Sequence, residues 1–368
     1  MLDRRLFRNI DYLMIFATLA LVAVGILIIG SATHINTPSE DRYWYVQRQG
    51  LFALMNIVLI LLMLKFDYRM LGSLGNVLYG VNLLMLIAVM FVGHSALGAQ
   101  RWIQLGPFSI QPSEFAKLIL IISLAHLLDS RTERLKSIWD VAPIFAFVIV
   151  PFLLVLKQPD LGTSLVFLAI LLGMVFAAGI DGKLLLKLAG AGVAALPFFW
   201  LFLKDYQKSR LSVFLDPNVD PLGAGYHIIQ SKIAIGSGQL FGKGLFNGTQ
   251  SQLNFLPENH TDFIFAVVGE ELGFVGAVAI LLLYFLLLYR GIKTAQNARD
   301  KFGMLLAAGI TSMLAFHVLI NVGMTIGIMP VTGIPLPFMS YGVSSLTTNL
   351  VSIGILLNIQ VRRQKLMF

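Results

Sequence analysis

The sequence predicts an all-α, polytopic membrane protein with about ten transmembrane helices. Its 368 residues are 57% hydrophobic and only 12% charged, whereas soluble domains carry about 25% charged residues. Apolar stretches recur along the chain at about 20 residues each, the length that a helix needs to cross a bilayer. The chain has no cysteine, so disulfides and thiolate metal sites are excluded.

The first of these stretches follows a basic N-terminal sequence, MLDRRLFRNID. No small-residue cleavage site and soluble domain follow it, so we expect an uncleaved first span rather than a signal peptide. In chain order the ten predicted spans are 12–31, 47–65, 71–93, 112–128, 141–157, 161–179, 184–203, 263–289, 304–328 and 341–361.

The Lys and Arg residues predict the orientation of these spans. The net charge is +8, but the basic residues lie scattered at span ends, which favours membrane topology over nucleic-acid binding. With the N-terminus inside, 17 of the 27 lie on the cytoplasmic side and 5 lie in or near the short outer loops. The other 5 belong to the segment 204–262. Charges in such a long loop do not determine membrane orientation, so we leave these 5 out of the comparison. We therefore expect both termini in the cytoplasm.

This orientation places the informative segments outside. They are GAQRWIQLGPFSIQPSEFAK (98–117), KQPDLGTS (157–164), the long loop 204–262 between spans seven and eight, and VTGIPLPFMSYGVSS (331–345). The inner loops are short and basic, so any chemistry is expected at the outer leaflet. Within the long loop, Tyr226, Ile229 and Ile233 share one helical face, which predicts a helix lying in the membrane interface.

Asp262 is the strongest candidate for a catalytic residue. It lies at the outer start of the eighth predicted span, close to Glu258 and His260. A carboxylate half-shielded from water can have a raised pKa, which suits a general base. The alternative is a structural role as the N-cap of that helix, a position that Asp favours.

Glu114 and Lys117 form a second polar feature, three residues apart near the outer end of the fourth span. They can pair on one helix face. Two interpretations stay open: the pair neutralises itself, or Lys117 holds an anionic ligand while Glu114 orients it.

Further charges lie in the other outer segments. Arg101 precedes Trp102, and the alternative to a binding role is an interfacial anchor with a snorkelling Arg. Asp160 is equally well explained as a helix cap. Arg210 and Lys232 lie in the long loop with Lys243, where each alone is a solvated charge. Together with Arg101 and Lys117, these cations could form a phosphate site.

Polar residues also occur at greater depth. Glu270 and Glu271 lie about two helical turns below Asp262, and at least one must face the bundle interior because lipid exposure is costly. His317 and Asn321 lie four residues apart, and we favour interhelical hydrogen bonds over a proton relay. No metal-ligand spacing and no phosphate-binding GK[ST] loop are present in the sequence.

These motifs resemble the SEDS family (shape, elongation, division, sporulation) over essentially the whole chain. The resemblance rests on GAQRWIQLGPFSIQPSEFAK, QPDLGTS, the segment 220–273 and GIPLPFMSYG. The text HIIQSKIAIGSG, followed by the HTDFIF motif that holds Asp262, is similar to the elongation member. The resemblance implies one membrane domain, 1–368, with 204–262 as its long extracytoplasmic loop.

The family resemblance also implies an activity. We expect a peptidoglycan glycosyltransferase that polymerises lipid II at the outer leaflet of the bacterial inner membrane, for elongation and rod shape. Its expected partner is a class B penicillin-binding transpeptidase. The resemblance makes Asp262 essential and maps the pair of the PSEFAK motif to Glu114 and Lys117. No cofactor is predicted, although a divalent cation could take part.

The expected mechanism is a single displacement with inversion. Asp262 would take the proton of the acceptor sugar's 4-hydroxyl, and the pyrophosphate of the donor is already a good leaving group, unlike in glycosidases. Cationic side chains would offset its charge. The predicted substrate-binding residues are Arg101, Glu114, Lys117, Asp160, Arg210, Lys232, Glu258 and His260.

Three alternatives remain open at this point. The chain could be a lipid II flippase, which needs a polar route through the full bilayer depth. It could be a non-catalytic scaffold that positions the transpeptidase. It could also be a division or sporulation paralogue of the same family.

Overall fold

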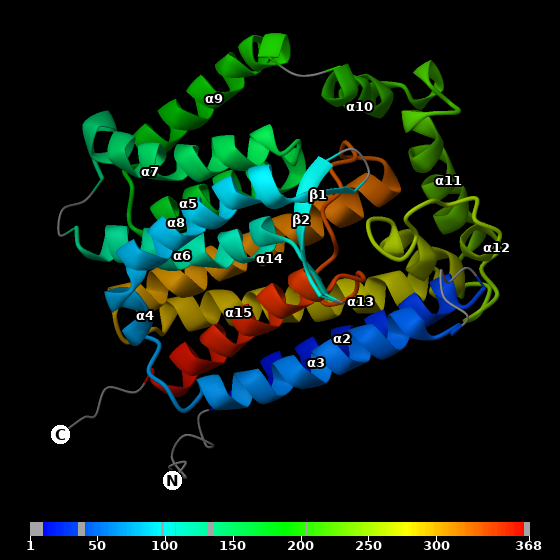
Figure 1. Ribbon diagram of the computed structural model, residues 1–368, viewed down its shortest axis with the longest axis horizontal. Coiled ribbons are helices and arrows are strands. Elements are labelled where there is room, and N and C mark those ends of the chain that lie inside the picture. The colour runs from blue at the N-terminus through cyan, green and yellow to red at the C-terminus, as the bar shows by residue number, and fades with distance from the viewer. Residues whose placement is uncertain are drawn as a thin grey trace.

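A computed structural model describes residues 10–35, 41–96, 99–106, 108–131, 135–202 and 205–363. In these ranges the fold is dominated by long helices that run back and forth between two ends of a bundle (Figure 1). The long helices are α2 (Tyr12–Thr33), α3 (Trp44–Met63), α5 (Gly75–Val92), α6 (Pro112–Asp129), α7 (Ile138–Lys157), α8 (Leu161–Ala177), α9 (Gly182–Phe202), α13 (Ile264–Gln296), α14 (Lys301–Ile326) and α15 (Val343–Val361).

Each long helix falls on one of the ten predicted spans. Seven of them are long and apolar enough to cross a membrane: α2, α3, α5, α7, α13, α14 and α15. By contrast, α8 has only 17 residues, and α6 carries Glu114, Lys117 and Asp129. The all-α membrane fold is confirmed, and the count of ten crossings stays a prediction.

The core of the bundle forms around α14 and α15. Helix α14 packs against α6, α8, α13 and α15, and most of its side chains are buried. The peripheral helices α3, α5 and α7 instead expose large apolar side chains, including Phe91 at 81% and Trp139 at 82%. Such a surface suits a lipid environment, because a soluble protein rarely exposes contiguous apolar area on this scale.

Helix α13 is broken at Gly273, which was not predicted. Gly273 has φ +65° and ψ −164°, so the helix is interrupted there. A Cβ at this position would lie 2.3 Å from the backbone nitrogen of Gly242. The segment 239–244 satisfies the freed backbone groups: Lys243 N donates to Glu270 O and Val275 N donates to Leu240 O. A break in a membrane helix is tolerated when neighbouring protein supplies such bonds.

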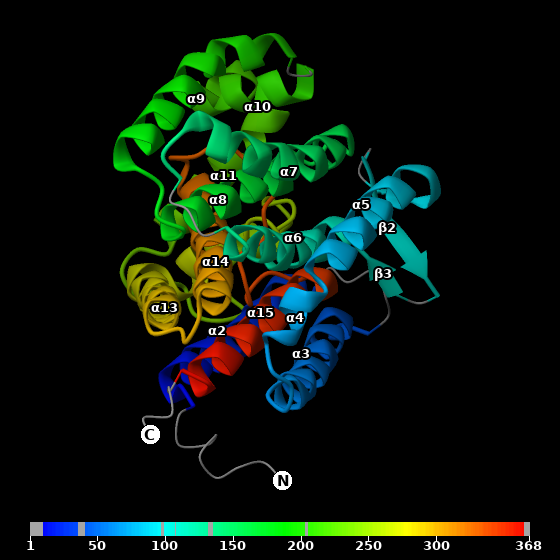
Figure 2. The same cartoon turned by 90° about the vertical axis from the view of Figure 1, so that its left-hand side faces the viewer.

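The segment before α6 folds into a small antiparallel sheet, also not predicted. Its strands, in the order β1-β2-β3, are β1 (His94–Ala96), β2 (Ala99–Leu105) and β3 (Phe108–Ile110). Gly106, at φ +62°, turns the chain between β2 and β3. Figure 2 shows the sheet at the margin of the bundle beside α5.

The long loop contains helices α10 (Asp205–Leu215), η1 (Pro217–Val219), α11 (Ala224–Ser237) and α12 (Thr249–Gln252). The predicted helix is therefore present as α11, which packs on α13 and α14. Its buried positions include Ile228, Ser231 and Ala234, whereas Ile233 of the predicted apolar face is 46% exposed. Its placement in the membrane interface stays a prediction.

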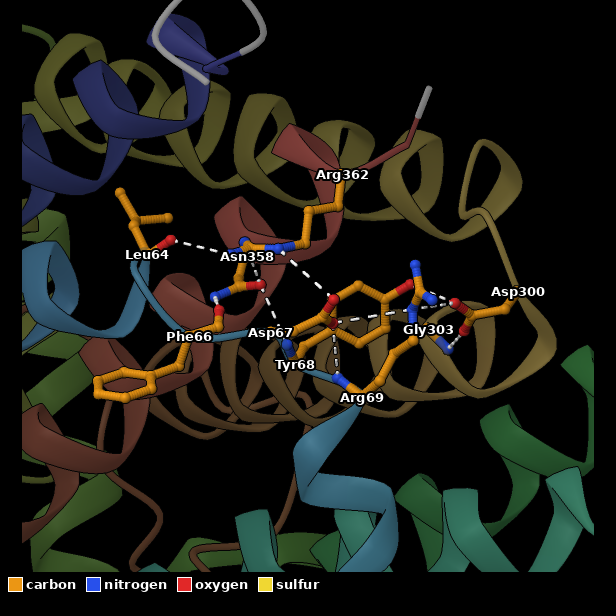
Figure 3. A network of polar contacts seen from close by, with 9 residues as sticks. All are labelled: Leu64, Phe66, Asp67, Tyr68, Arg69, Asp300, Gly303, Asn358 and Arg362. Carbon is orange, nitrogen blue, oxygen red and sulfur yellow. Dashed lines mark hydrogen bonds and ion pairs between the residues drawn. The ribbon is translucent and has the colours of Figure 1, made fainter. Parts of the chain in front are cut away.

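One end of the bundle, which we call the basic end, holds several of its charges in ion pairs. Arg290 contacts Asp11 at 2.6 Å, and Arg69 contacts Asp300 at 3.2 Å. In Figure 3, Tyr68 donates to Asp300 at 2.6 Å while Asn358 and Arg362 of α15 close the same network. Asp300 and burial together raise the pKa of the Tyr68 hydroxyl well above its usual range. Every charged group drawn in the network has a partner.

The other end, which we call the Asp262 end, gathers the four segments predicted to lie outside. The backbone of Tyr341 donates to the His260 carbonyl at 2.9 Å, joining the long loop to the segment 331–345. The backbone of Gln111 donates to the Ser344 hydroxyl at 3.1 Å. Arg101 of β2 bonds the turn 157–160. Segments far apart in the chain thus meet at one end of the bundle, as expected.

Candidate functional site

The Asp262 carboxylate is unpaired among the residues that the structure describes. Asp262 is half-buried and lies just before α13, whose N-cap is Phe263. No side chain in the described ranges caps this helix, so the interpretation of Asp262 as an N-cap is wrong. Its Oδ2 atom lies over Gly333, where an added Cβ would be 3.3 Å away. A half-buried carboxylate without a structural partner is available to a ligand.

The surroundings of Asp262 favour its protonated form. Loss of hydration on burial is the main cause that raises the pKa of this carboxyl from 3.8 to about 6. The charge of Glu258 and, less strongly, that of Asp160 act in the same direction, while Arg210 and Arg101 oppose them. The carboxylate is thus mostly ionised at pH 7 and is a stronger base than an ordinary Asp, as proton abstraction requires.

Arg101 and Asp160, whose charges both act on this carboxylate, are in contact with each other. The Arg101 Nε atom donates to the Gln158 carbonyl at 3.0 Å, and Nη2 donates to the Pro159 carbonyl. Its Nη1 atom lies 3.8 Å from Asp160 Oδ1. Arg101 is therefore fixed against the 157–160 turn and is no free interfacial anchor.

Asp160 is the N-cap of α8, as its structural alternative predicted. Its Oδ1 atom accepts from the Thr163 backbone at 3.1 Å and its Oδ2 atom accepts from the Thr163 hydroxyl at 3.0 Å. The side chain is 3% exposed. Its influence on Asp262 is therefore that of a fixed negative charge.

Of the two predicted cations in the long loop, Arg210 lies at the site and Lys232 does not contact it. Arg210 Nη1 donates to the Val331 carbonyl at 3.2 Å, two residues from Gly333, and its charge acts on Asp262. Lys232 is part of α11, and its side chain lies against Gly327, the C-cap residue of α14. Lys243 pairs with Glu270 at 2.8 Å.

Glu258 and His260 flank Asp262 with different environments. Glu258 is exposed, at φ +51°, and its Oε2 atom accepts from the Thr261 hydroxyl at 3.0 Å. The His260 ring packs against Tyr45 and Tyr341, at centroid distances of 4.8 and 5.9 Å. Burial lowers the pKa of His260, and the charge of Glu258 only partly offsets it. His260 is therefore neutral at pH 7.

Glu114 and Lys117 form a buried ion pair with a distance of 2.8 Å from Nζ to Oε1. The exposed fractions of the side chains are 3% and 1%. The Nζ atom of Lys117 also lies 3.3 Å from Nε2 of His317 on α14. The second Glu114 oxygen and His317 Nδ1 have no hydrogen-bond partner in the described part of the chain. This geometry fits the self-neutralising interpretation, and ligand binding by Lys117 stays a prediction.

The deeper polar residues are used in packing. His317 contacts Lys117 of α6, and Asn321 donates to the backbone carbonyls of Asp262 and Ile334 at 2.9 and 2.8 Å. These interhelical and helix–loop bonds are those expected for the pair. Glu270 and Glu271 are both 0% exposed.

The two glutamates bind different segments of the chain. Glu270 accepts from the backbone of Gln250 at 2.9 Å and from Lys243. Glu271 accepts from Ser31 of α2 at 2.6 Å. The expectation that at least one faces the interior is confirmed for both.

The sequence analysis did not single out Gly333 or Ser340. Gly333 has φ +73° and supplies the surface under the Asp262 carboxylate. Ser340 donates to the Thr261 carbonyl at 2.6 Å. The signal available was their position in the predicted outer segment 331–345, where glycine, proline and serine alternate with apolar residues.

A search of the described ranges finds no group of three or more His, Asp or Glu side chains placed to hold a metal ion. The basic side chains that act on Asp262 are Arg101 and Arg210. Together with the half-buried carboxylate they form a site with one base and two cations, which suits proton abstraction beside an anionic leaving group.

Comparison with known proteins places this architecture among characterised relatives. Residues 11–365 match the family model of the FtsW, RodA and SpoVE cell cycle proteins. The chain is 41% identical to the peptidoglycan glycosyltransferase MrdB of Escherichia coli K12, covering 97% of this chain and 95% of the relative.

Two solved structures resemble the fold. One is a chain of a peptidoglycan synthase complex that coordinates polymerization and crosslinking, with a TM-score of 0.81 at 36% identity, covering 97% of this chain and 99% of the other. The second is the rod shape determining protein RodA of Thermus thermophilus, with a TM-score of 0.72 at 33% identity, covering 97% and 98%.

Proposed function

The chain belongs to the FtsW, RodA and SpoVE family, and from this premise we propose that it is a RodA-type peptidoglycan glycosyltransferase with Asp262 as its general base. The observation that carries the assignment of the base is the half-buried Asp262 carboxylate, which is bound by no described residue. In this proposal the enzyme polymerises lipid II into glycan strands for cell elongation.

The proton transfer follows from the environment of Asp262. A pKa near 6 keeps the carboxylate ionised at pH 7 yet basic enough to accept the proton of an acceptor 4-hydroxyl. The oxygen then attacks the anomeric carbon of the donor from the face opposite the pyrophosphate, and the configuration at that carbon inverts. One base suffices because pyrophosphate leaves without protonation, unlike the leaving group of a glycosidase.

Arg101 and Arg210 are the cations that we assign to the departing diphosphate. Both act on the charge of Asp262, and each has guanidinium nitrogens that can bind a phosphate oxygen. Lys117 and Glu114 would act from the bundle interior, and Glu258 and His260 would border the acceptor. Lys232 is the weakest member of the predicted set because its aliphatic chain lies against Gly327. No cofactor is proposed, and a divalent cation could share the charge with the arginines.

The topology is also part of the proposal. We place the Asp262 end, with the loop 204–262, at the outer face of the inner membrane, and both termini in the cytoplasm, because Lys and Arg favour the cytoplasmic side. The whole chain then forms one membrane domain. A class B penicillin-binding transpeptidase is the proposed partner, supported by the likeness to a chain of a solved synthase complex.

Lipid II transport finds little support in the polar residues at depth. Glu270 binds the loop before α13, Glu271 binds Ser31 of α2, and Lys117 is paired with Glu114. A flippase would need such groups along a route through the bilayer.

The test is glycan formation from lipid II by purified protein with its partner transpeptidase. We expect Asp262→Asn to lose at least about 100-fold in rate, the usual contribution of a general base, while remaining folded. Asp216→Asn is the control and should keep the wild-type rate, since it removes a carboxylate charge of the same long loop, where Asp216 caps η1 and accepts from the Asn218 backbone at 3.0 Å. Polymerisation by Asp262→Asn at the wild-type rate would overturn the assignment of the base, and polymerisation by none of the proteins would overturn the enzymatic function.

A further inference from the structure

The segment that precedes α13 is held by three consecutive backbone carbonyls. The His260 carbonyl accepts from the Tyr341 backbone at 2.9 Å. The Thr261 carbonyl accepts from the Ser340 hydroxyl at 2.6 Å. The Asp262 carbonyl accepts from the Asn321 side chain at 2.9 Å. The donors come from α14 and from the segment before α15, so elements distant in sequence fix one short stretch of backbone.

Asn321 joins both sides of the site. It is fully buried on α14, and its Nδ2 atom uses one bond for Asp262 and the second, at 2.8 Å, for the Ile334 carbonyl. Ile334 follows Gly333, the residue over which the Asp262 carboxylate lies. One amide group therefore sets the distance between the carboxylate-bearing residue and the surface beneath it.

Ser340 adds a second brace to the same stretch. Its hydroxyl donates to Thr261 and accepts from the Leu336 backbone at 2.8 Å, so both of its hydrogen-bonding roles are used. The side chain is 4% exposed. A buried hydroxyl that donates to one segment and accepts from another holds the two at a fixed separation.

The Asp262 carboxylate depends on this backbone for its position, because no described residue bonds the carboxylate itself. We propose that Asn321 and Ser340 are positioning residues, which hold the Asp262 backbone so that its carboxylate faces the acceptor hydroxyl. The inference rests on the proposed function and adds two residues that touch neither substrate nor reacting atoms.

The expected effect is on the rate of the chemical step. A displacement of about 1 Å at a catalytic group can lower the rate about 100-fold even when the substituted residue lies away from the reaction. Binding of lipid II involves other parts of the site. Loss of either brace should therefore lower kcat and leave KM nearly unchanged.

The bundle supplies a matched control at its basic end. Asn358 of α15 is 4% exposed, and its Nδ2 atom donates to two backbone carbonyls, those of Met63 at 2.7 Å and Phe66 at 2.9 Å. Figure 3 shows it between Phe66 and the network around Tyr68. Like Asn321, it donates two hydrogen bonds to backbone carbonyls, and its Oδ1 atom also accepts from Tyr68 N at 3.3 Å and from Arg362 at 2.6 Å. Because Asn358 lies at the basic end, its loss reports a structural effect that does not involve the Asp262 backbone.

The experiment compares Asn321→Leu, Ser340→Ala and Asn358→Leu, with Asp262→Asn alongside, for glycan polymerisation with the partner transpeptidase and for thermal unfolding. We expect kcat to fall about 10- to 100-fold for Asn321→Leu and Ser340→Ala, with KM within about twofold of the wild-type value. Asn358→Leu should destabilise the fold at least as much as Asn321→Leu, because Asn358 makes more hydrogen bonds, but it should keep kcat within about threefold.

Equal kcat values for Asn321→Leu and Asn358→Leu would overturn the inference. If Asn321→Leu does not fold, Ser340→Ala decides, since it removes a single hydroxyl, and a wild-type kcat there rejects the inference. An active Asp262→Asn protein would instead reject the proposed base, so the two failures can be told apart.

Discussion

At the basic end, Arg69, Arg290 and Arg362 each lie within 4 Å of an aspartate, whereas at the Asp262 end the central carboxylate has no described partner. Aspartates at the basic end are thus used in ion pairs, whereas Asp262 at the other end remains available to bind a ligand. A carboxylate kept half-buried without a partner costs stability, and such costs are typical of functional sites. We therefore infer that the paired charges stabilise the fold and that the unpaired Asp262 carboxylate is the reactive one.

The largest change in the free energy of unfolding is expected for the buried Glu114–Lys117 ion pair. Lys117→Met leaves Glu114 buried without its cation, and breaking one side of a buried pair costs about 3–5 kcal/mol. The double variant Glu114→Gln with Lys117→Met removes both charges and should recover most of that loss. Thermal or denaturant unfolding in detergent measures both, and equal losses in the single and double variants would contradict a buried ion pair.

Removal of the Asp262 charge should stabilise the protein, in contrast to removal of the Lys117 charge. The pKa of Asp262 is about 6 in the folded protein and 3.8 for an ordinary Asp, so the folded state binds the proton more tightly. The stability associated with the protonated form is lost as pH rises between these values, and at pH 7.5 the ionised group is unfavourable. Asp262→Asn should therefore stabilise the protein at pH 7.5 by about 1 kcal/mol, after allowance for partial exposure.

Unfolding curves at pH 7.5 and pH 5 test this expectation. The advantage of Asp262→Asn should shrink at pH 5, since the wild-type carboxyl is then largely protonated. A variant less stable than wild type at pH 7.5 would mean that the carboxylate contributes to the fold.

The smallest change in the free energy of unfolding is expected for Arg69→Ala at the basic end. Arg69→Ala removes half-exposed contacts with Asp67 and Asp300, and such pairs contribute about 0–1 kcal/mol. Unfolding should change by no more than that, and kcat for polymerisation should stay at the wild-type value. A large loss of activity would show that the two ends are coupled.

The helices could be predicted from the sequence because each span is mainly apolar over about the length of a membrane crossing. The break at Gly273 could not, since it depends on the contact with Gly242 of the preceding loop. The strands before α6 are short and were hidden within a polar outer segment. Local periodicity identifies long helices well and short, tertiary-dependent elements poorly.

The sequence also indicated part of the candidate site, because the orientation of the spans determines which loops share one end of the bundle. Orientation alone placed Asp262, Asp160, Arg101 and Arg210 at one end, and the structure brings their charges together. Which side chains face Asp262 depends on packing, which the sequence does not give, and the binding role of Lys232 stays a prediction. Ser340 went unnoticed because only its contact with Thr261 gives it a role.

The pH dependence of kcat for glycan polymerisation tests the central claim most directly. If Asp262 is the general base, the rate should fall on the acid side with a midpoint near pH 6. Glu258→Gln removes a charge that raises this pKa and should lower the midpoint, whereas Arg210→Met should raise it. A rate independent of pH between 5 and 8, or midpoints that do not move in these opposite directions, would contradict the account.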